Sequence, residues 1–98
     1  MQRAEELAVM YSHTRPDGTA WNTVFGDELK TLYWWGENIA YGQKTAERIA
    51  EAWLESESHR KNIMAEKYTH GVIGYATDAD GQIHWVNLFW TPKSEITK

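Results

Sequence analysis

The chain has 98 residues, a formal net charge of −4 and no cysteine. This length predicts one domain, which we place at residues 1–92, followed by a polar, frayed tail at residues 93–98. Interspersed acidic and basic residues with a negative balance argue against a nucleic-acid binder, and the lack of cysteine excludes disulfides and thiolate metal ligands. Six Trp, five Tyr and two Phe supply large side chains for a core or, where they are exposed, for a binding surface.

A first helix is predicted at residues 3–11, because apolar side chains recur there at helical spacing. The apolar face consists of Ala4, Leu7, Ala8 and Tyr11. The positions that fall outside this face and are expected to point into water are Arg3, Glu5 and Glu6. A turn at Pro16-Asp17-Gly18 follows the helix, and the next residues indicate only a short helical turn before Gly26.

The strongest helix signal runs from Ala46 to Glu55, where Thr45 is a suitable N-cap residue. Its apolar stripe consists of Ala46, Ile49, Ala50, Trp53 and Leu54. Ser56 or Ser58 can then cap a further short helix, which carries His59 and extends to Met64.

The last third of the chain has the period of β-strands. Residues 71–77 and 82–90 are predicted strands, and Asp78-Ala79-Asp80-Gly81 is the predicted turn between them, since Asp-Gly is a strong hairpin signal. The second strand is apolar on both faces, as expected of a strand that is covered on both sides. The pattern therefore predicts an α+β domain with helices on both faces of a small antiparallel sheet.

The stretch from Gly36 to Gly42 places a carboxylate, Glu37, and an amide, Asn38, among apolar and aromatic neighbours. A carboxylate that is shielded from water needs hydrogen bonds, a counter-charge or a metal, because otherwise it takes up a proton. We expect Glu37 to have such partners, and Asn38, Ile39 and Ala40 to hold a loop against the core.

The four histidines are the first candidates for those partners. His13 lies in the loop after the first helix, His59 opens the short helix, His70 precedes a strand, and His84 alternates with apolar residues within a strand. Taken singly, each of them fits a structural or solvated role better than that of a ligand. HExxH, a glycine-rich phosphate loop and a serine nucleophile elbow are all absent from the sequence. Spacing alone thus predicts no more than a compact α+β domain with a His/Glu cluster.

Four segments, in order and at similar spacing, resemble the motifs of the CAP superfamily, which includes the cysteine-rich secretory proteins, insect venom allergens and plant pathogenesis-related proteins. The segments are Ser12-His13, Gly36-Glu37-Asn38-Ile39-Ala40, Trp53-x-x-Ser56-x-x-His59-Arg60-x-Asn62-Ile63-Met64 and Trp85-Val86-Asn87-Leu88-Phe89. Each motif alone is weak, but four in the right order are specific. The resemblance is strongest to the disulfide-free bacterial branch, the SCP-like extracellular proteins.

The resemblance implies a three-layer α-β-α sandwich with a central cleft that is lined by a His/Glu tetrad. Three tetrad positions fall on His13, Glu37 and His59. The fourth, which is usually acidic in eukaryotic members, falls on Ser56, so its role is open. Asn38 and Asn62 are expected to be structural. Family domains begin with a further helix upstream of the one at residues 3–11, so we expect a truncated domain or an apolar face that another chain covers.

Two imidazoles and a carboxylate suit a divalent metal, zinc above all, with water completing the shell. In this hypothesis His13 and His59 are the ligands, and Glu37 orients one imidazole or reaches the metal through water. The alternative is a buried hydrogen-bonded cluster that binds no metal and only holds loops together. Nothing in the sequence decides between these two hypotheses.

The leading functional hypothesis is a non-enzymatic binding module, extracellular or on the bacterial cell surface, for a small apolar, lipid-like or sterol-like ligand or for a cell-wall component. One alternative is a metal-assisted hydrolase of peptides or glycans, with Glu37 as general base on a metal-bound water. Another is an interaction module that forms a homodimer through the face left open by the missing helix. The chain shows no secretion-signal pattern and no stretch that suits a transmembrane span.

Overall fold

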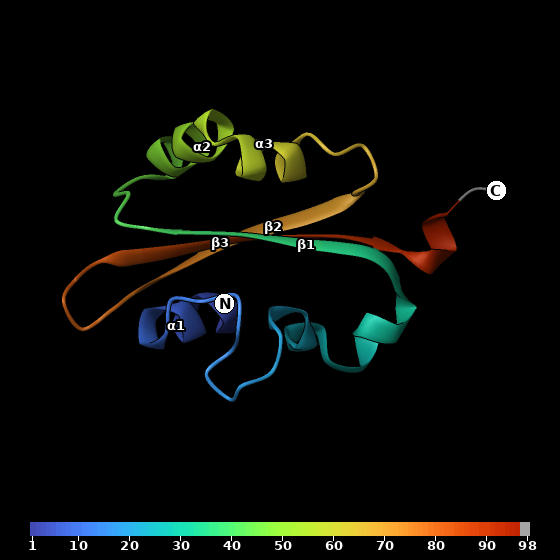
Figure 1. Ribbon diagram of the computed structural model, residues 1–98, viewed down its shortest axis with the longest axis horizontal. Helices are drawn as coiled ribbons and strands as arrows, with labels where there is room; N and C mark the ends of the chain where they lie inside the picture. Colours follow the sequence, from blue (N-terminus) through green and yellow to red (C-terminus); the bar gives the residue numbers. More distant parts are fainter. Residues whose placement is uncertain (97–98) are drawn as a thin grey trace.

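A three-stranded antiparallel sheet lies between two helical layers in the computed structural model, which describes residues 1–96 (Figure 1). The elements are α1 (Gln2–Val9), the 3-10 segment η1 (Trp21–Thr31), β1 (Leu32–Tyr41), α2 (Ala46–Glu55), α3 (Glu57–Ile63), β2 (His70–Thr77), β3 (Ile83–Pro92) and the short 3-10 helix η2 (Lys93–Glu95). The strand order is β1-β3-β2, so β3 is central. Helices α2 and α3 cover one face, and α1 with η1 covers the other, which confirms the α+β fold with helices on both faces (Figure 1).

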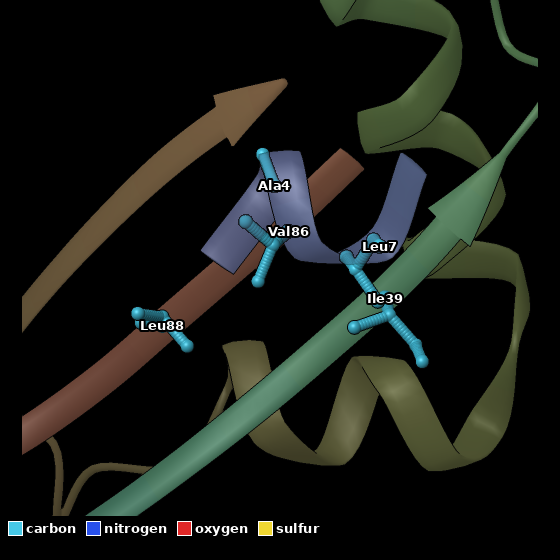
Figure 2. Packing of buried hydrophobic residues seen from close by; sticks show 5 residues of the cluster. All are labelled: Ala4, Leu7, Ile39, Val86 and Leu88. Atoms are coloured by element: carbon cyan, nitrogen blue, oxygen red, sulfur yellow. The ribbon is translucent and has the colours of Figure 1, made fainter. Parts of the chain in front are cut away.

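The core has two parts, one on each face of β3. On the α1 face, Ala4 and Leu7 pack against Ile39 of β1 and against Val86 and Leu88 of β3 (Figure 2). On the other face, the buried side chains that α2 packs against the sheet are Ile49 and Trp53, and they meet Trp85. Because alternate residues of β3 serve opposite faces, the whole middle of this strand is apolar, as the sequence predicts.

The strand β1 is the main departure from the sequence-based expectation, which treated Gly36–Gly42 as a loop. The residues of this stretch pair with β3 from Trp35 opposite Trp90 to Tyr41 opposite His84. Strand signals are weak here because Gly36, Glu37 and Asn38 interrupt the apolar pattern. Both faces of the strand are covered, so the alternation that marks a half-exposed strand is missing.

The predicted hairpin and the predicted cap of α2 are both confirmed. In the turn between β2 and β3, the N–H of Asp78 donates to the carbonyl of Gln82 at 2.9 Å, and Gly81 has φ of 82°. A positive φ at this position is the reason for a glycine. At the start of α2, the Thr45 hydroxyl accepts the N–H of Arg48 at 3.1 Å.

The helical turn predicted before Gly26 is also present, as the first part of η1. The segment breaks at Gly26, which has φ of 60° and ψ of −139°. The predicted tail begins with more order than expected, because residues 93–95 form η2 and the carboxylate of Glu95 lies 2.7 Å from Nε2 of His70. The last two residues of that tail, 97–98, lie outside the described residues.

Candidate functional site

Glu37 lies in the middle of β1 with 6% of its surface exposed, which agrees with the expected shielding. Its main partner is Arg3 of α1, which donates from Nε to Oε2 at 2.6 Å and from Nη2 to Oε1 at 3.2 Å. Arg3 is itself fully buried, and its Nη2 also donates to the carbonyl of Ser12. The counter-charge that Glu37 requires is therefore a guanidinium, held in a two-point contact.

Arg3 is the site residue that sequence reasoning missed, since the helical pattern placed it in water. Its position on α1 is next to the apolar face, and its long side chain reaches under β1 to the buried carboxylate. Another nitrogen, Nη1, lies 3.5 Å from the carboxylate of Glu6 but makes no hydrogen bond. The sequence does contain a signal that indicates Arg3. A buried carboxylate needs a cation, and Arg3 is a cation next to the apolar face of the first helix.

His13 completes the cluster around Glu37 from the solvent side. Its Nδ1 lies 2.8 Å from Oε1 of Glu37, and its side chain is 60% exposed. A hydrogen bond from Nδ1–H to the carboxylate leaves Nε2 as the acceptor of the neutral ring. The predicted pairing of His13 with Glu37 is thus part of the structure, at the rim of the site.

His59 approaches the same edge of β1 from α3. Its Nδ1 lies 2.9 Å from the hydroxyl oxygen of Ser56, the N-cap residue of α3, and this hydroxyl makes no capping hydrogen bond to the helix. Burial lowers the pKa of His59 from its usual 6.5, and the nearby charge of His13 lowers it further. The imidazoles of His13 and His59 are therefore close enough to interact electrostatically. No hydrogen bond joins His59 to Glu37 within residues 1–96.

Asn38 faces away from Glu37, because neighbouring residues of a strand point to opposite faces. It donates from Nδ2 to the backbone carbonyl of His59 at 3.1 Å and accepts at Oδ1 from Nδ2 of Asn62 at 2.9 Å. Asn38 is fully buried, and both of these contacts tie β1 to α3. This arrangement fits the structural role expected for Asn38 and Asn62, and it fixes the helix that carries His59.

Tyr11 is a further neighbour of the site that the sequence did not indicate. Its ring packs edge-on against Tyr41, with centroids 4.8 Å apart. Burial raises the pKa of Tyr11, and the nearby Tyr41 and Glu37 raise it further. His84 pairs with a different carboxylate, since its Nε2 lies 2.7 Å from Oδ2 of Asp78.

The metal hypothesis requires ligands beyond two imidazoles. Within residues 1–96, no group of three His, Cys, Asp or Glu side chains is placed to hold a metal ion. Both oxygens of Glu37 are engaged by Arg3, so this carboxylate has little capacity left for a cation. His13 and His59 each have one ring nitrogen anchored by a neighbouring side chain, an arrangement that also orients metal-binding imidazoles in other proteins.

A groove opens on the α1 face of the sheet, and Arg3 belongs to its lining as well as to the cluster around Glu37. Its volume is about 340 Å³. The apolar side chains that line it are Met1, Val24, Phe25, Leu32, Val72, Leu88 and Trp90. Arg3 and Glu28 supply charge at its border. The groove has the size and the lining of a site for a small apolar molecule.

The architecture and the cluster on β1 define a CAP-type domain. The model of the cysteine-rich secretory protein family, CAP, matches residues 1–91, and the chain belongs to this family. The family assignment that the four sequence motifs predicted is thus confirmed.

Two curated proteins of Bacillus subtilis share parts of this sequence. The uncharacterized protein YkwD is 53% identical over 51 residues, which cover 52% of this chain and 19% of YkwD. The uncharacterized membrane protein YlbC is 46% identical over 39 residues, which cover 40% of this chain and 11% of YlbC. The matched segments are thus a small part of both relatives.

Two solved structures have the same fold. An outer surface protein of Borrelia burgdorferi superposes with a TM-score of 0.75 at 22% identity, covering 94% of this chain and 72% of that one. An extracellular protein of Bacillus anthracis that contains an SCP domain superposes with a TM-score of 0.73 at 24% identity, covering 91% of this chain and 29% of that one. Within residues 1–96, helices with the length and apolar character of a membrane span are absent.

Proposed function

We propose that this chain is a non-enzymatic CAP module that acts outside the bacterial cell or on its surface and binds a small apolar ligand in the groove on its α1 face. The observation that carries the proposal is the groove itself, with about 340 Å³ of volume and a largely apolar lining. The extracellular setting is supported by the two solved structures of the same fold, one an outer surface protein and the other an extracellular protein.

The geometry of Glu37 favours binding over hydrolysis. A general base on a metal-bound water needs a free carboxylate oxygen within reach of that water. In this chain Arg3 contacts both oxygens of Glu37, and His13 contacts one of them as well. The carboxylate is thus committed to a buried ion pair, which supports a structural role and leaves the metal-assisted hydrolase as the weaker alternative.

The test for the apolar ligand uses a long-chain fatty acid and a sterol as probes. Trp90 lines the groove, so we expect saturable quenching of tryptophan emission together with heat on calorimetric titration. Val72→Glu places a charge at the groove, where Val72 is 41% exposed, and should abolish both signals. Leu54→Glu is the matched control, because Leu54 is 43% exposed on α2, on the opposite face, and it should bind as the wild type does.

If neither probe binds, or if the two glutamate variants bind equally, the groove is not the ligand site. Trp90→Phe separates the readouts further. This variant should lose most of the change in emission and keep the calorimetric heat, because the groove retains an aromatic ring.

As a second candidate, we propose weak binding of a divalent metal by Nε2 of His13 and of His59, with water or a ligand completing the shell. The anchored Nδ1 atoms of both rings favour it. Zinc titrated into the wild type should release heat and broaden the imidazole NMR signals of both residues. His13→Ala/His59→Ala should show neither effect, whereas the control His70→Ala, on an exposed ring paired with Glu95, should match the wild type. Equal heats in all three proteins would exclude this site.

A further inference from the structure

The sheet has two edges, β1 and β2, and residues 1–96 protect the edge of β1 but not that of β2. The pairing of β1 shifts register between Leu32 and Trp34, and the Tyr68 hydroxyl donates to the carbonyl of Trp35 at 3.1 Å. A bulge and a covering side chain are common protections of an edge strand. Within residues 1–96, β2 has neither protection: its register with β3 is continuous from His70 to Thr77, and no side chain outside the β2–β3 pair hydrogen-bonds its backbone.

The phase of the backbone hydrogen bonds shows which groups of β2 point outward. Asp78 N–H donates to the carbonyl of Gln82, so this pair lies at a hydrogen-bonded position of the antiparallel ladder. Because hydrogen-bonded and open positions alternate, the even-numbered residues of β2 face β3. The side-chain amide of Asn87, which donates to the carbonyl of Val72 at 3.0 Å, agrees with this phase.

The outward groups are therefore those of Gly71, Ile73, Tyr75 and Thr77. No side chain or loop of the described residues hydrogen-bonds them. The residues between His70 and Asp78 include no charge and no proline, and the side chains of Ile73 and Tyr75 are 54% and 63% exposed. An edge with free backbone groups, exposed apolar side chains and no charge is a template for another strand.

We propose that β2 pairs antiparallel with β2 of a second copy of this chain, about a two-fold axis at Ile73, to give one continuous sheet across the dimer. In this register Ile73 lies opposite Ile73 of the second copy, and Tyr75 lies opposite Gly71. Each of these is a hydrogen-bonded position, so the outward groups of both copies satisfy one another. This interface uses the edge of the sheet and not the apolar groove on its α1 face.

The side chains in this register are self-complementary, which is why a second copy fits better than an arbitrary peptide. The Tyr75 ring packs against Trp85 of its own chain, with ring centroids 5.3 Å apart. Gly71 of the second copy lies opposite Tyr75 and leaves room for the exposed part of its ring. The side chain of Ile73 packs against that of Ile73 in the second copy. No like charges meet, because His70 lies opposite Ala76. The short strand pair predicts a weak dimer that forms with increasing concentration.

Light scattering and sedimentation from micromolar to millimolar concentration test the proposal. The wild type should shift from monomer to dimer. Ile73→Pro removes an outward N–H without removing a ladder bond and should stay monomeric, with an unchanged near-UV spectrum as the check of folding. Ile73→Lys places like charges directly opposite one another and should raise the dimer Kd at least about tenfold, whereas Ile73→Thr keeps the backbone donor and should still dimerise.

Single cysteines test the register, because the chain has no cysteine of its own. Opposed residues of a hydrogen-bonded pair are about 5.5 Å apart at Cα, within the range of a disulfide. Ile73→Cys should therefore oxidise to a covalent dimer. Tyr75→Cys should not, because the two positions 75 are offset by roughly 13 Å along the strands.

Three outcomes would overturn the proposal. The first is a wild type that stays monomeric throughout the concentration series. The second is a dimer that persists in both Ile73→Pro and Ile73→Lys and is lost in Val72→Glu, which would place the interface at the groove on the α1 face. The third is a Tyr75→Cys crosslink that forms as readily as that of Ile73→Cys.

Discussion

The two outer strands of the sheet share one partner and differ in what covers them. β1 and β2 both pair antiparallel with β3, yet the middle of β1 from Gly36 to Ile39 is buried while most of β2 is exposed. Arg3 reaches β1 from α1, and Asn62 reaches it from α3, so both of its faces carry helices. Pairing with β3 is enough to make each of these segments a strand. Whether polar side chains on the strand are held in one arrangement depends on the helices that cover it.

The largest expected effect concerns the ion pair under β1. Glu37→Ala leaves the fully buried guanidinium of Arg3 without its counter-charge, and we expect a loss of about 3–5 kcal/mol in the free energy of unfolding. Urea unfolding measures this loss. Glu55→Ala, on an exposed carboxylate of α2, is the control and should stay within about 0.5 kcal/mol of the wild type.

Removing both charges sharpens the same test. Arg3→Met/Glu37→Leu should be considerably more stable than Glu37→Ala, because no unpaired charge remains in the core. An unchanged urea midpoint for Glu37→Ala would mean that Arg3 finds water or another partner, and β1 would then not depend on this pair.

A matched pair of truncations compares the two strands directly. Ile39→Ala removes a side chain that is 6% exposed and packed on Ala4, Leu7 and Val86, and should cost about 2–5 kcal/mol. Ile73→Ala removes the same atoms from a side chain that is 54% exposed and should cost less than about 1 kcal/mol in dilute solution. Similar losses at both positions would show that β2 is covered in solution, and the protein concentration dependence of the loss would show whether a second copy covers it.

The next largest loss of stability is expected from breaking the hydrogen bonds between β1 and α3. Asn38→Ala removes the acceptor for Asn62 and the donor to the carbonyl of His59, and should cost about 1–3 kcal/mol. The double variant Asn38→Ala/Asn62→Ala should lose less than the sum of the two single variants, since both share one hydrogen bond. Strict additivity would argue that the two amides act independently.

The smallest effect concerns the contact between the His70 imidazole and the Glu95 carboxylate, which tethers β2 to η2. The hydrogen bond from His70 lowers the pKa of the Glu95 carboxyl below its usual 4.5. Because the folded-state pKa is below the unfolded one, the pair contributes stability above pH 4.5, and this contribution is lost as the pH falls through the folded-state pKa. An NMR titration should show the low pKa of Glu95 in the wild type and a value closer to 4.5 in His70→Gln, where Thr69 still lowers the pKa. Added salt should weaken the shift, because both groups are partly exposed.

How much of the fold the sequence predicts depends on how regular each segment is. α2 and the β2–β3 hairpin were predicted closely, because Thr45 and Asp-Gly are local signals whose chemistry needs no distant partner. β1 was not predicted, because its identity depends on pairing with β3, more than forty residues further along the chain. The burial of Arg3 was missed for the same reason, since the buried carboxylate that attracts it belongs to another element.

The site was partly accessible from the sequence. His13 and Glu37 were expected to be near one another, and the structure places Nδ1 of the one 2.8 Å from Oε1 of the other. His59 was expected in the same cleft, and in the structure its ring contacts the hydroxyl of Ser56, whose role was open. The sequence could not indicate that Arg3 donates hydrogen bonds to both oxygens of Glu37. This contact matters most for the chemistry of the site, because it makes Glu37 an ion-pair partner.

The sequence by itself determined the family, the helical and strand segments with local signals, and the need of Glu37 for a partner. Those features follow from residue spacing, caps, turns and the cost of burying a charge, which act within a few residues or on a single group. Only the tertiary structure decided that Arg3 is that partner, that Gly36–Gly42 is a paired strand, and that β2 keeps an unprotected edge. Each of these depends on contacts between elements far apart in the chain, where long side chains and shared hydrogen bonds override the local pattern.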